Sequence, residues 1–289
     1  MSRNLDRTGA TPGGSDVPPA HPVSADDAEN DSFSFSYVVP TELIDIPSGG
    51  RFYSDGHPVS GKSYIEIRHM TAKEEDILTS RTLLQKGLAI DRLLKNIMVD
   101  KSIDPSSLLT GDRNALIIAA RKTGYGPEYT TNVTCPACAT TARYEFDLNE
   151  FLVNEGGNSD LAEVQETTDK TFLVELPTSG VNVELRLMTG RDELNSQKKS
   201  KGKIKAGLGD IKLTEQIKNF IVSVNGSTST KDIGTFVNNM PAKDSRFLRN
   251  VYAEITPNID TTQEYECGTC GYEQDMEVPL TADFFWPKR

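Results

Sequence analysis

The chain contains four cysteines, and all of them lie in two Cys-x-x-Cys motifs, Cys135 with Cys138 and Cys267 with Cys270. A gap of two residues lets both sulfurs of a tight turn face one ion, and two such turns complete a tetrahedron with Zn–S distances of about 2.3 Å. The spacing therefore predicts one structural zinc per chain, bound by all four cysteines. Four protein ligands leave no open coordination position, so we expect no catalytic metal.

Three alternatives to structural zinc remain open for these cysteines. A rubredoxin-like iron has the same four ligands, but nothing else in the sequence suggests electron transfer. A thioredoxin-type dithiol needs its motif at a helix N-terminus, whereas strand-like sequence lies on both sides here. The third alternative is four free thiols.

Strand-like sequence flanks both cysteine motifs, which predicts that each motif is the turn of a β hairpin. The expected strands are Glu128 to Thr134 and Thr141 to Leu148 around the first motif, and Thr262 to Glu266 and Tyr272 to Leu280 around the second. Two such hairpins joined by one ion form a zinc ribbon with four cysteine ligands. Because the motifs are 132 residues apart, the fold must bring distant parts of the chain together.

The sequence also resembles itself at an offset that grows in one direction, which indicates an internal duplication. Residues 65–71 match 183–189 at an offset of 118, and residues 94–99 match 217–222 at an offset of 123. Asp112 and Leu116 match Asp244 and Leu248 at 132, and the cysteine motifs match at the same offset. We therefore predict two tandem degenerate copies, each supplying half of the zinc ligands.

The sequence of each copy predicts a strand pair, followed by helices and then a cysteine hairpin. The expected fold class is therefore α+β. Thr71-x-x-Glu74 fits a capping box at the first helix, and Thr189-x-x-Asp192 repeats it with a shorter acid that secures only half of the box. The expected strand pairs are Leu43 to Ile46 with Ser63 to Ile67, and Phe172 to Leu176 with Val181 to Leu187. The expected helices are 72–85, 91–99 and 113–122, with 191–199, 213–223 and 245–253 in the second copy.

Composition divides the chain into four parts. Residues 1–32 contain no aromatic residue and are rich in proline, glycine and aspartate, which predicts a disordered acidic tail. Residues 33–153 form the first copy, with a strand expected at Phe33 to Tyr37. Residues 154–170 are expected to be an acidic, solvated linker, and residues 171–289 form the second copy.

Charge and hydropathy exclude several classes of protein. The chain has 31 Lys and Arg against 42 Asp and Glu, a net charge of −11, which repels phosphate backbones. The hairpin strands are themselves acidic, so we expect no nucleic-acid binding. No apolar run reaches the roughly 18 residues of a membrane span, and no apolar core follows the first residues as in a signal peptide. We therefore expect an unexported protein without membrane contact.

Other sequence features carry weaker predictions. The three histidines, His21, His57 and His69, do not lie in a sequence pattern with cysteine or serine that is typical of a catalytic site. No other residue pattern suggests a nucleophile and a base. We therefore expect that the protein is not an enzyme. The lysines at 198, 199, 201, 203 and 205 predict a solvated loop or a site for an acidic protein. Phe284 to Pro287 predicts a lid on the core of the second copy or a docking anchor.

Two stretches near the start of the first copy, Ile46 to Tyr53 and Ile65 to Leu78, are similar to the baseplate hub assembly family of T-even-type contractile-tailed bacteriophages. Further matching positions are Leu93-Leu94, Asp104, Leu108-Leu109, Gly111 to Asn114, Ile117 to Arg121, Gly124 to Gly126 and Cys135-Pro136-x-Cys138. The likeness covers about residues 40–150 well, and the second half mainly through Met188-Thr189 and its cysteine motif.

The resemblance implies a non-enzymatic structural component or assembly factor of the baseplate central hub. Its implied partners are other phage hub and tail proteins. Its implied location is the tail baseplate of the virion, and the host cytoplasm during assembly. The alternative, from another class of protein, is a zinc-ribbon module that binds nucleic acid or has a regulatory role. The acidic residues of the hairpins disfavour this alternative.

Overall fold

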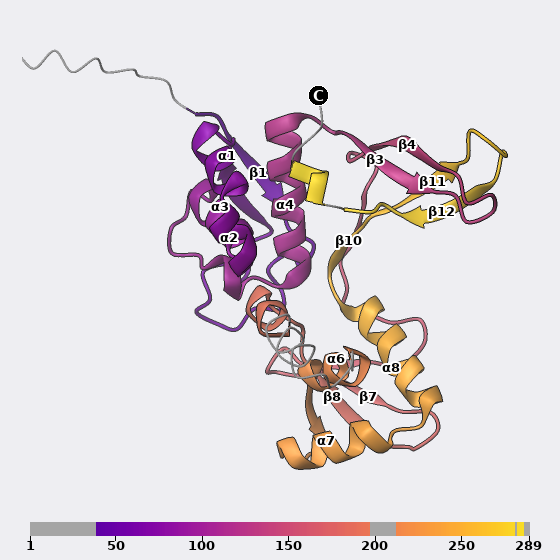
Figure 1. Cartoon of the computed structure of the whole chain (residues 1–289). Coiled ribbons are helices and arrows are strands. Elements are labelled where there is room, and N and C mark those ends of the chain that lie inside the picture. Colours follow the sequence, from indigo (N-terminus) through magenta and orange to yellow (C-terminus); the bar gives the residue numbers. More distant parts are fainter. Residues whose placement is uncertain (1–38, 197–211, 281, 286–289) are drawn as a thin grey trace, which may run out of the picture. The chain divides into compact units, whose positions relative to one another are not determined.

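The computed structural model describes residues 39–196, 212–280 and 282–285, in which helices alternate with small antiparallel sheets (Figure 1). The first half contains β1 (Thr41–Asp45), β2 (Tyr64–Arg68), α1 (Ala72–Thr79), α2 (Arg81–Lys86), α3 (Ala89–Ile97), the 3-10 helix η1 (Pro105–Ser107), α4 (Thr110–Tyr125), β3 (Glu128–Thr134), β4 (Thr141–Asp147) and β5 (Leu152–Asn154). The second half contains β6 (Gln165–Glu166), β7 (Phe172–Glu175), β8 (Asn182–Leu185), a helical stretch over 190–196, α6 (Lys212–Phe220), β9 (Ile221–Val224), α7 (Thr230–Asn239), α8 (Ala242–Ile255), β10 (Asn258–Asp260), β11 (Thr262–Glu266), β12 (Glu273–Glu277) and the 3-10 helix η2 (Ala282–Phe285). The fold is mixed α and β, as the sequence predicts.

Strand pairing is antiparallel throughout the described residues. Four sheets are two-stranded, β1-β2, β3-β4, β11-β12 and β5-β10, and the fifth has the order β6-β7-β8-β9. The expected strands around both cysteine motifs are confirmed as β3, β4, β11 and β12. The β5-β10 pair joins the two halves of the chain, because Asn154 lies opposite Asn258.

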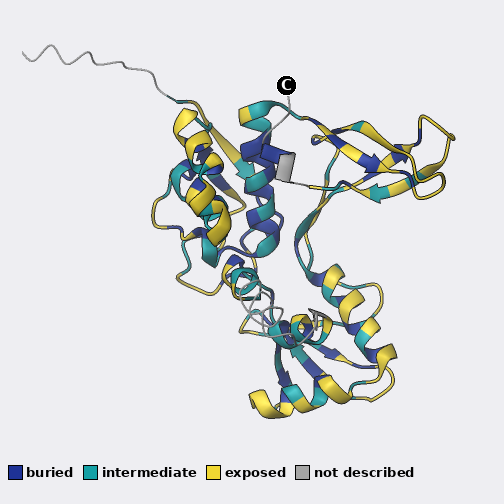
Figure 2. Cartoon of the chain, in the orientation of Figure 1, coloured by how far each residue is buried: buried dark blue, intermediate teal, exposed yellow. Residues whose placement is uncertain are grey.

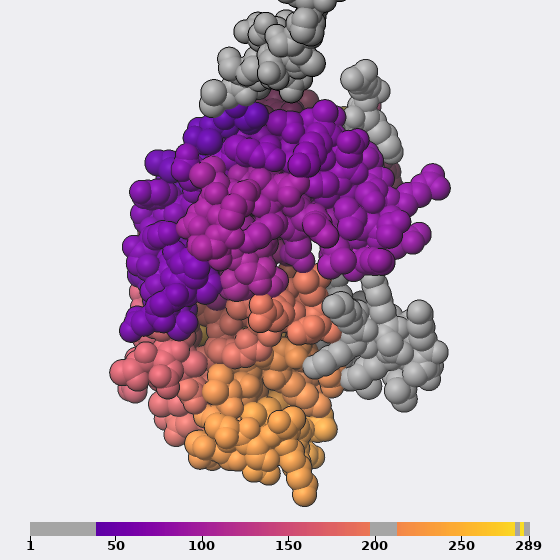
Figure 3. Space-filling view, turned by 90° about the vertical axis from the view of Figure 1, so that its left-hand side faces the viewer, coloured from indigo at the N-terminus to yellow at the C-terminus, as the bar shows by residue number. Residues whose placement is uncertain are grey.

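Helix α4 is the central element of the first half. Its side chains are buried on several sides, so it is largely dark blue in Figure 2. Leu116 and Ala120 are fully buried, and the elements of residues 39–125 form a continuous surface in the space-filling view (Figure 3). Gly111, in the first turn of α4, has no room for a side chain because an added Cβ would lie 1.8 Å from the carbonyl oxygen of Pro257.

A buried aspartate anchors the loop that follows β1. Asp112 of α4 is fully buried and accepts hydrogen bonds from Ser48 N at 2.9 Å, Ser48 Oγ at 2.6 Å and the Tyr53 hydroxyl at 2.7 Å. In the second half Asp244 of α8 is also fully buried, and it accepts from Thr178 N at 2.9 Å and Ser179 N at 3.0 Å. Each aspartate thus holds the turn between the strands of its own half.

The helices that follow β2 and β8 begin with the same arrangement of charged groups, an acid in the first turn bound by an arginine of the preceding strand segment. Glu74 accepts hydrogen bonds from Thr71 N and Oγ1 at 3.0 and 2.7 Å and from both terminal nitrogens of Arg68. In the second half Asp192 accepts from Thr189 N and Oγ1 at 3.0 and 2.8 Å, and from both terminal nitrogens of Arg186. The shorter aspartate therefore makes the same contacts as glutamate, although the sequence predicts only half of a capping box there.

One predicted helix ends early. The sequence predicts a helix over residues 213–223, but α6 ends at Phe220 and Ile221–Val224 form β9. The reason is a long-range pairing with β8, in which Leu185 lies opposite Ile221. The first half has the same pairing as a single bridge between Ile67 and Met98.

Helix α7 was not predicted from the sequence. Its first turn is capped by Ser229, whose Oγ accepts from Asp232 N at 3.4 Å, and the Ser-x-x-Asp spacing was an available signal. The expected helix 72–85 is divided into α1 and α2 at Ser80.

Several predicted segments lie outside the described residues: the tail 1–32, the strand at Phe33 to Tyr37, and the lysines at 198, 199, 201, 203 and 205. The linker predicted at 154–170 contains the last residue of β5 and all of β6, which pairs with β7. The copy boundaries 33–153 and 171–289 remain a prediction. In the described ranges, no helix has the length and apolar character needed to span a membrane.

The paired acids predict a loss of stability in acid. Burial alone would raise the pKa of Glu74, but hydrogen bonds from Arg68 and Thr71 lower it to about 2. Burial is likewise outweighed at Asp192 by Arg186 and Thr189, so that its pKa is also about 2. A depressed carboxyl pKa stabilises the fold above the unfolded-state pKa, and this stabilisation disappears as pH falls toward the folded-state value.

We expect the free energy of unfolding to fall between about pH 4.5 and pH 2, with roughly 3 kcal/mol of the loss due to Glu74. Urea unfolding over this pH range measures the loss. Glu74→Gln should flatten the curve in this window, whereas Asp76→Asn, at an exposed position of the same helix, should leave it unchanged. Identical pH profiles for wild type and Glu74→Gln would contradict the assignment.

Candidate metal centre

The two cysteine turns have the same backbone geometry. In each, the N–H of the first cysteine, Cys135 or Cys267, donates to the carbonyl five residues later at 2.9 Å. The N–H four residues later donates back to the carbonyl of that cysteine, at 2.9 and 2.8 Å respectively. The residue after the second cysteine is left-handed in both turns, Ala139 with φ 55° and Gly271 with φ 67°. Equal turns present their sulfurs in equal ways.

The four sulfurs converge on one point. Cys135 Sγ lies 3.8 Å from Cys270 Sγ, and Cys138 Sγ lies 3.8 Å from Cys267 Sγ. All four sulfurs are within 4.8 Å of one another. A tetrahedron with metal–sulfur bonds of about 2.3 Å has edges of about 3.8 Å, so the donor set and its spacing fit a four-coordinate zinc. The structure therefore brings together all four residues that the sequence predicts as ligands.

Hydrogen bonds and the neighbouring sulfurs shift the pKa of three thiols, two downward and one upward. Backbone N–H groups of Cys270 and Thr269 lower the pKa of Cys267 to about 6. The hydroxyl and the backbone of Thr140 lower the pKa of Cys138. At Cys270 the backbone of Tyr272 acts in the same direction, but burial and the other three sulfurs outweigh it and raise the pKa to about 12. Four thiolates in this space repel one another, and a divalent cation would relieve that repulsion.

Side chains of both hairpins hold the two turns together. The ring of Tyr144 on β4 lies 5.0 Å from that of Tyr265 on β11, edge to face. Gln263 Nε2 donates to the carbonyl of Asp147 at 2.6 Å. Because these contacts join β3-β4 to β11-β12, the hairpins form the paired arrangement that the sequence predicts for a ribbon (Figure 1).

Comparison with protein families decides the relationship of the chain to known proteins. Residues 43–286 match the family described as T4 bacteriophage base plate protein. The chain belongs to this family. No curated protein and no solved structure matched the chain.

Membership in the base plate protein family confirms the resemblance to phage baseplate proteins and supports a structural role in the tail. The match extends through both cysteine motifs, whereas the resemblance seen in the sequence was strongest over residues 40–150. The family match therefore includes the second half of the chain as well. Membership also implies contact with other phage tail proteins and a place in the tail of the virion.

The C-terminal aromatic residues of this base plate protein cover elements of the first half. Phe284 and Phe285 are buried, and the ring of Phe284 lies 5.2 Å from that of Tyr129 on β3. Arg121 of α4, which is 1% exposed, donates through Nε to the carbonyl of Phe284 at 2.7 Å. The predicted lid on the second copy is therefore a lid on α4 and β3. Trp286 lies outside the described residues.

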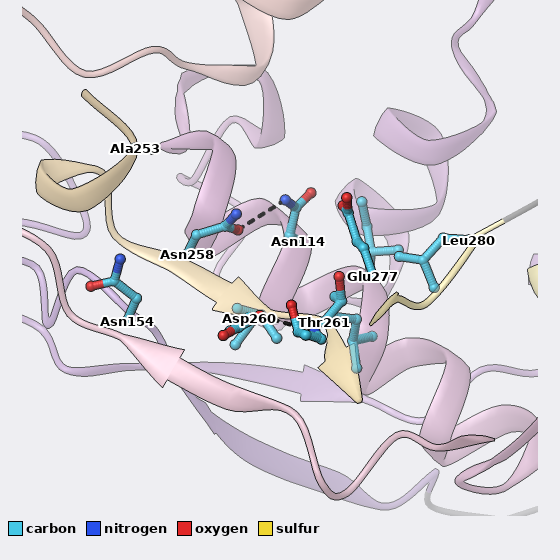
Figure 4. Close-up of a pocket in the computed structure, with 12 residues that line it drawn as sticks. Asn114, Asn154, Ala253, Asn258, Asp260, Thr261, Glu277 and Leu280 are labelled. Carbon is cyan, nitrogen blue, oxygen red and sulfur yellow. Dashed lines mark hydrogen bonds between the residues drawn. The ribbon is translucent and has the colours of Figure 1, made fainter. Parts of the chain in front are cut away.

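A polar pocket of about 340 Å³ lies where α4 meets β10 (Figure 4). Asn114 Nδ2 donates to Asn258 Oδ1 across it at 3.2 Å, and Asp260 and Glu277 supply carboxylates. The lining also includes the hydroxyl residues Thr261 and Thr262, and apolar side chains such as Ile117 and Ile259.

Proposed function

We propose that this base plate protein is a non-enzymatic component or assembly factor of the baseplate central hub. The family match over residues 43–286 carries the proposal, and the similarity of Ile46 to Tyr53 and Ile65 to Leu78 to hub assembly proteins supports the hub in particular. The protein would act in the host cytoplasm during assembly and in the tail baseplate of the virion.

We further propose that the four cysteines bind one structural zinc per chain. The support is the 3.8 Å spacing of the sulfur pairs and a donor set made entirely of thiols. Each sulfur pair joins one cysteine of the first motif to one of the second. A zinc bound there would clamp segments 132 residues apart and stabilise the scaffold without any chemical turnover.

An internal duplication explains why each half supplies two ligands. Its support is the recurrence of equivalent contacts: an arginine and a threonine on the helix-cap acid, a buried aspartate on the strand-pair turn, and the same hydrogen bonds in both cysteine turns. Arg68 and Arg186 are 118 residues apart, and Asp112 and Asp244 are 132 apart, the offsets of the sequence matches. The zinc would then join copy to copy.

One serine–histidine pair, Ser107 and His57, is in hydrogen-bond contact, and the direction of its hydrogen bond supports a non-enzymatic role. His57 Nδ1 accepts from Val59 N at 3.2 Å, so in the neutral ring the proton is on Nε2. Nε2 lies 2.9 Å from Ser107 Oγ and therefore donates to it, and Ser107 Oγ donates to the carbonyl of Asp104 at 2.7 Å. A general base must accept the serine proton instead, so this pair lacks the arrangement that activates a nucleophile.

The acidic hairpins support protein partners over nucleic acid. On β11-β12 the register places Glu264 opposite Asp275 and Glu266 opposite Glu273. Like charges directly opposite each other destabilise a strand pair, and they also repel phosphate. These pairs leave the second hairpin with an acidic outer surface that a nucleic-acid ribbon would not have.

Affinity capture tests the proposed partners. The tagged full-length chain, co-expressed with each hub and tail protein of its phage in turn, should retain one or more hub proteins through washing at moderate salt. Capture of tail proteins outside the hub, with no hub protein, would contradict the hub assignment.

A gel shift tests the alternative function. At about 150 mM salt we expect no binding of DNA or RNA, and micromolar binding would favour the zinc-ribbon nucleic-acid module instead.

A further inference from the structure

Strand β1 has one edge paired and one edge open. In its pairing with β2, His69 N donates to Pro40 O at 2.9 Å and Ile46 N donates to Ser63 O at 3.0 Å, which fixes the alternation of the ladder. Glu42 and Ile44 therefore direct their backbone groups toward β2. The backbone groups of Thr41, Leu43 and Asp45 point the other way, and no other element of the described residues pairs with them.

A groove of about 630 Å³ runs along this open edge. Four consecutive residues of β1, Glu42 to Asp45, line one side, and the buried side chains of Ala115, Ile118 and Ala119 on α4 line its base. Phe151 and Val153 line it from the segment around β5. Leu43 is 57% exposed and Val153 is 56% exposed, so apolar side chains lie open to solvent beside unpaired backbone groups.

The charges along the groove select the kind of partner. Glu42 and Asp45 have no ion-pair partner among residues 39–196, 212–280 and 282–285, and Lys122 is the one lysine of the lining. Edge strands commonly carry charged residues that discourage pairing with further copies of themselves. With a net charge of −11, the chain would resist a second copy at this edge and attract a basic segment.

We propose that an extended basic segment of a partner protein adds to β1 as a third strand. Its backbone would pair with Leu43 and Asp45. Its apolar side chains would enter the groove over α4, on the face of the sheet that carries Ile44, and its lysines or arginines would lie on the opposite face beside Asp45. A strand fits better than a helix because only an extended backbone can meet the unpaired groups of the edge. The inference deepens the proposed role as a binder of tail proteins and rests on it only for the choice of natural partners.

A peptide of alternating valine and lysine, with an alternating valine and glutamate peptide as its match, tests the site on the full-length chain. Fluorescence anisotropy should show binding of the lysine peptide, and hydrogen exchange should show new protection at the amides of Leu43 and Asp45. Glu42 and Ile44, which already pair with β2, should change little. The glutamate peptide should bind about tenfold more weakly or not at all.

Leu43→Pro is the sharpest variant because it removes the outward N–H without removing a bond to β2. Loss of one hydrogen bond and the added ring should weaken binding of the lysine peptide about fivefold to tenfold, whereas Leu43→Val, which keeps the N–H, should stay within about twofold. Should the proline variant fail to fold, Glu42→Lys combined with Asp45→Lys should reverse the preference between the peptides.

Three results would overturn the inference: no binding of the lysine peptide at millimolar concentration, binding that is indifferent to the charge reversal, or full protection of the Leu43 and Asp45 amides in the free chain. The last result would mean that another part of the chain or a second copy already occupies the edge, and sedimentation velocity would identify the second copy. Hub proteins captured equally by wild type and Leu43→Pro would refute this site while leaving the proposed function intact.

Discussion

Replacing Cys267 by serine should abolish stoichiometric metal binding and lower the free energy of unfolding by about 3–5 kcal/mol, within the roughly 10–16 kcal/mol of apparent binding free energy that four-ligand zinc sites provide. Cys267 is buried, and its sulfur lies 3.8 Å from that of Cys138 across the two hairpins. Without the ion, side-chain contacts such as that of Tyr144 with Tyr265 still join the hairpins. Calorimetry should record a fall in Tm of about 10 °C.

Thr269→Ser is the matched control because Thr269 is exposed in the same turn, between Cys267 and Cys270. This variant should keep the metal and the wild-type Tm. A strong chelator should then lower the Tm of wild type and Thr269→Ser equally and have no further effect on Cys267→Ser. A chelator effect of the same size on Cys267→Ser would show that these cysteines do not hold the stabilising ion.

Replacing Asp112 by alanine should have the second largest effect. The change leaves three buried donors without their acceptor, namely Ser48 N, Ser48 Oγ and the Tyr53 hydroxyl. Each unsatisfied buried group costs about 1–3 kcal/mol, and partial rearrangement of the hydroxyls should bring the total to about 3–5 kcal/mol. Chemical denaturation of the full-length chain measures this loss.

The equivalent change in the second half separates burial from hydrogen bonding. Asp244→Ala also removes an acceptor, but its donors belong to Thr178 and Ser179, which are exposed and can bond to water. We expect a loss of about 1–2 kcal/mol there, and a change within about 0.5 kcal/mol for Asp55→Ala at an exposed position of the first loop. Equal losses for Asp112→Ala and Asp55→Ala would contradict the anchoring role of Asp112.

Local spacing was enough to predict the cysteine site and the strands beside it. The interval between Cys135 and Cys138 predicts a turn. The strand predicted at residues 128–134 has the same bounds as the observed β3. Self-similarity then related the two distant motifs without any knowledge of the fold. The convergence of all four sulfurs follows from these two observations together.

Features that depend on remote contacts could not be predicted in the same way. Residues 221–223 continue a helical pattern in the sequence, but pairing with β8 makes them a strand. Arg121 looks like one polar member of an apolar helix, yet its guanidinium binds the carbonyls of Gly126, Glu128 and Phe284. Arg68 and Arg186 lay inside the repeated segments, but nothing in the spacing assigned them to the helix-cap acids.

The metal content of the purified full-length chain tests the central claim most directly. Elemental analysis should find one zinc per chain, and the four thiols should react with a thiol reagent only after a chelator is added. One iron per chain would keep the sulfur site but contradict zinc. No metal, with all four thiols freely reactive, would contradict the account that two cysteine hairpins bind a common ion and hold the scaffold together.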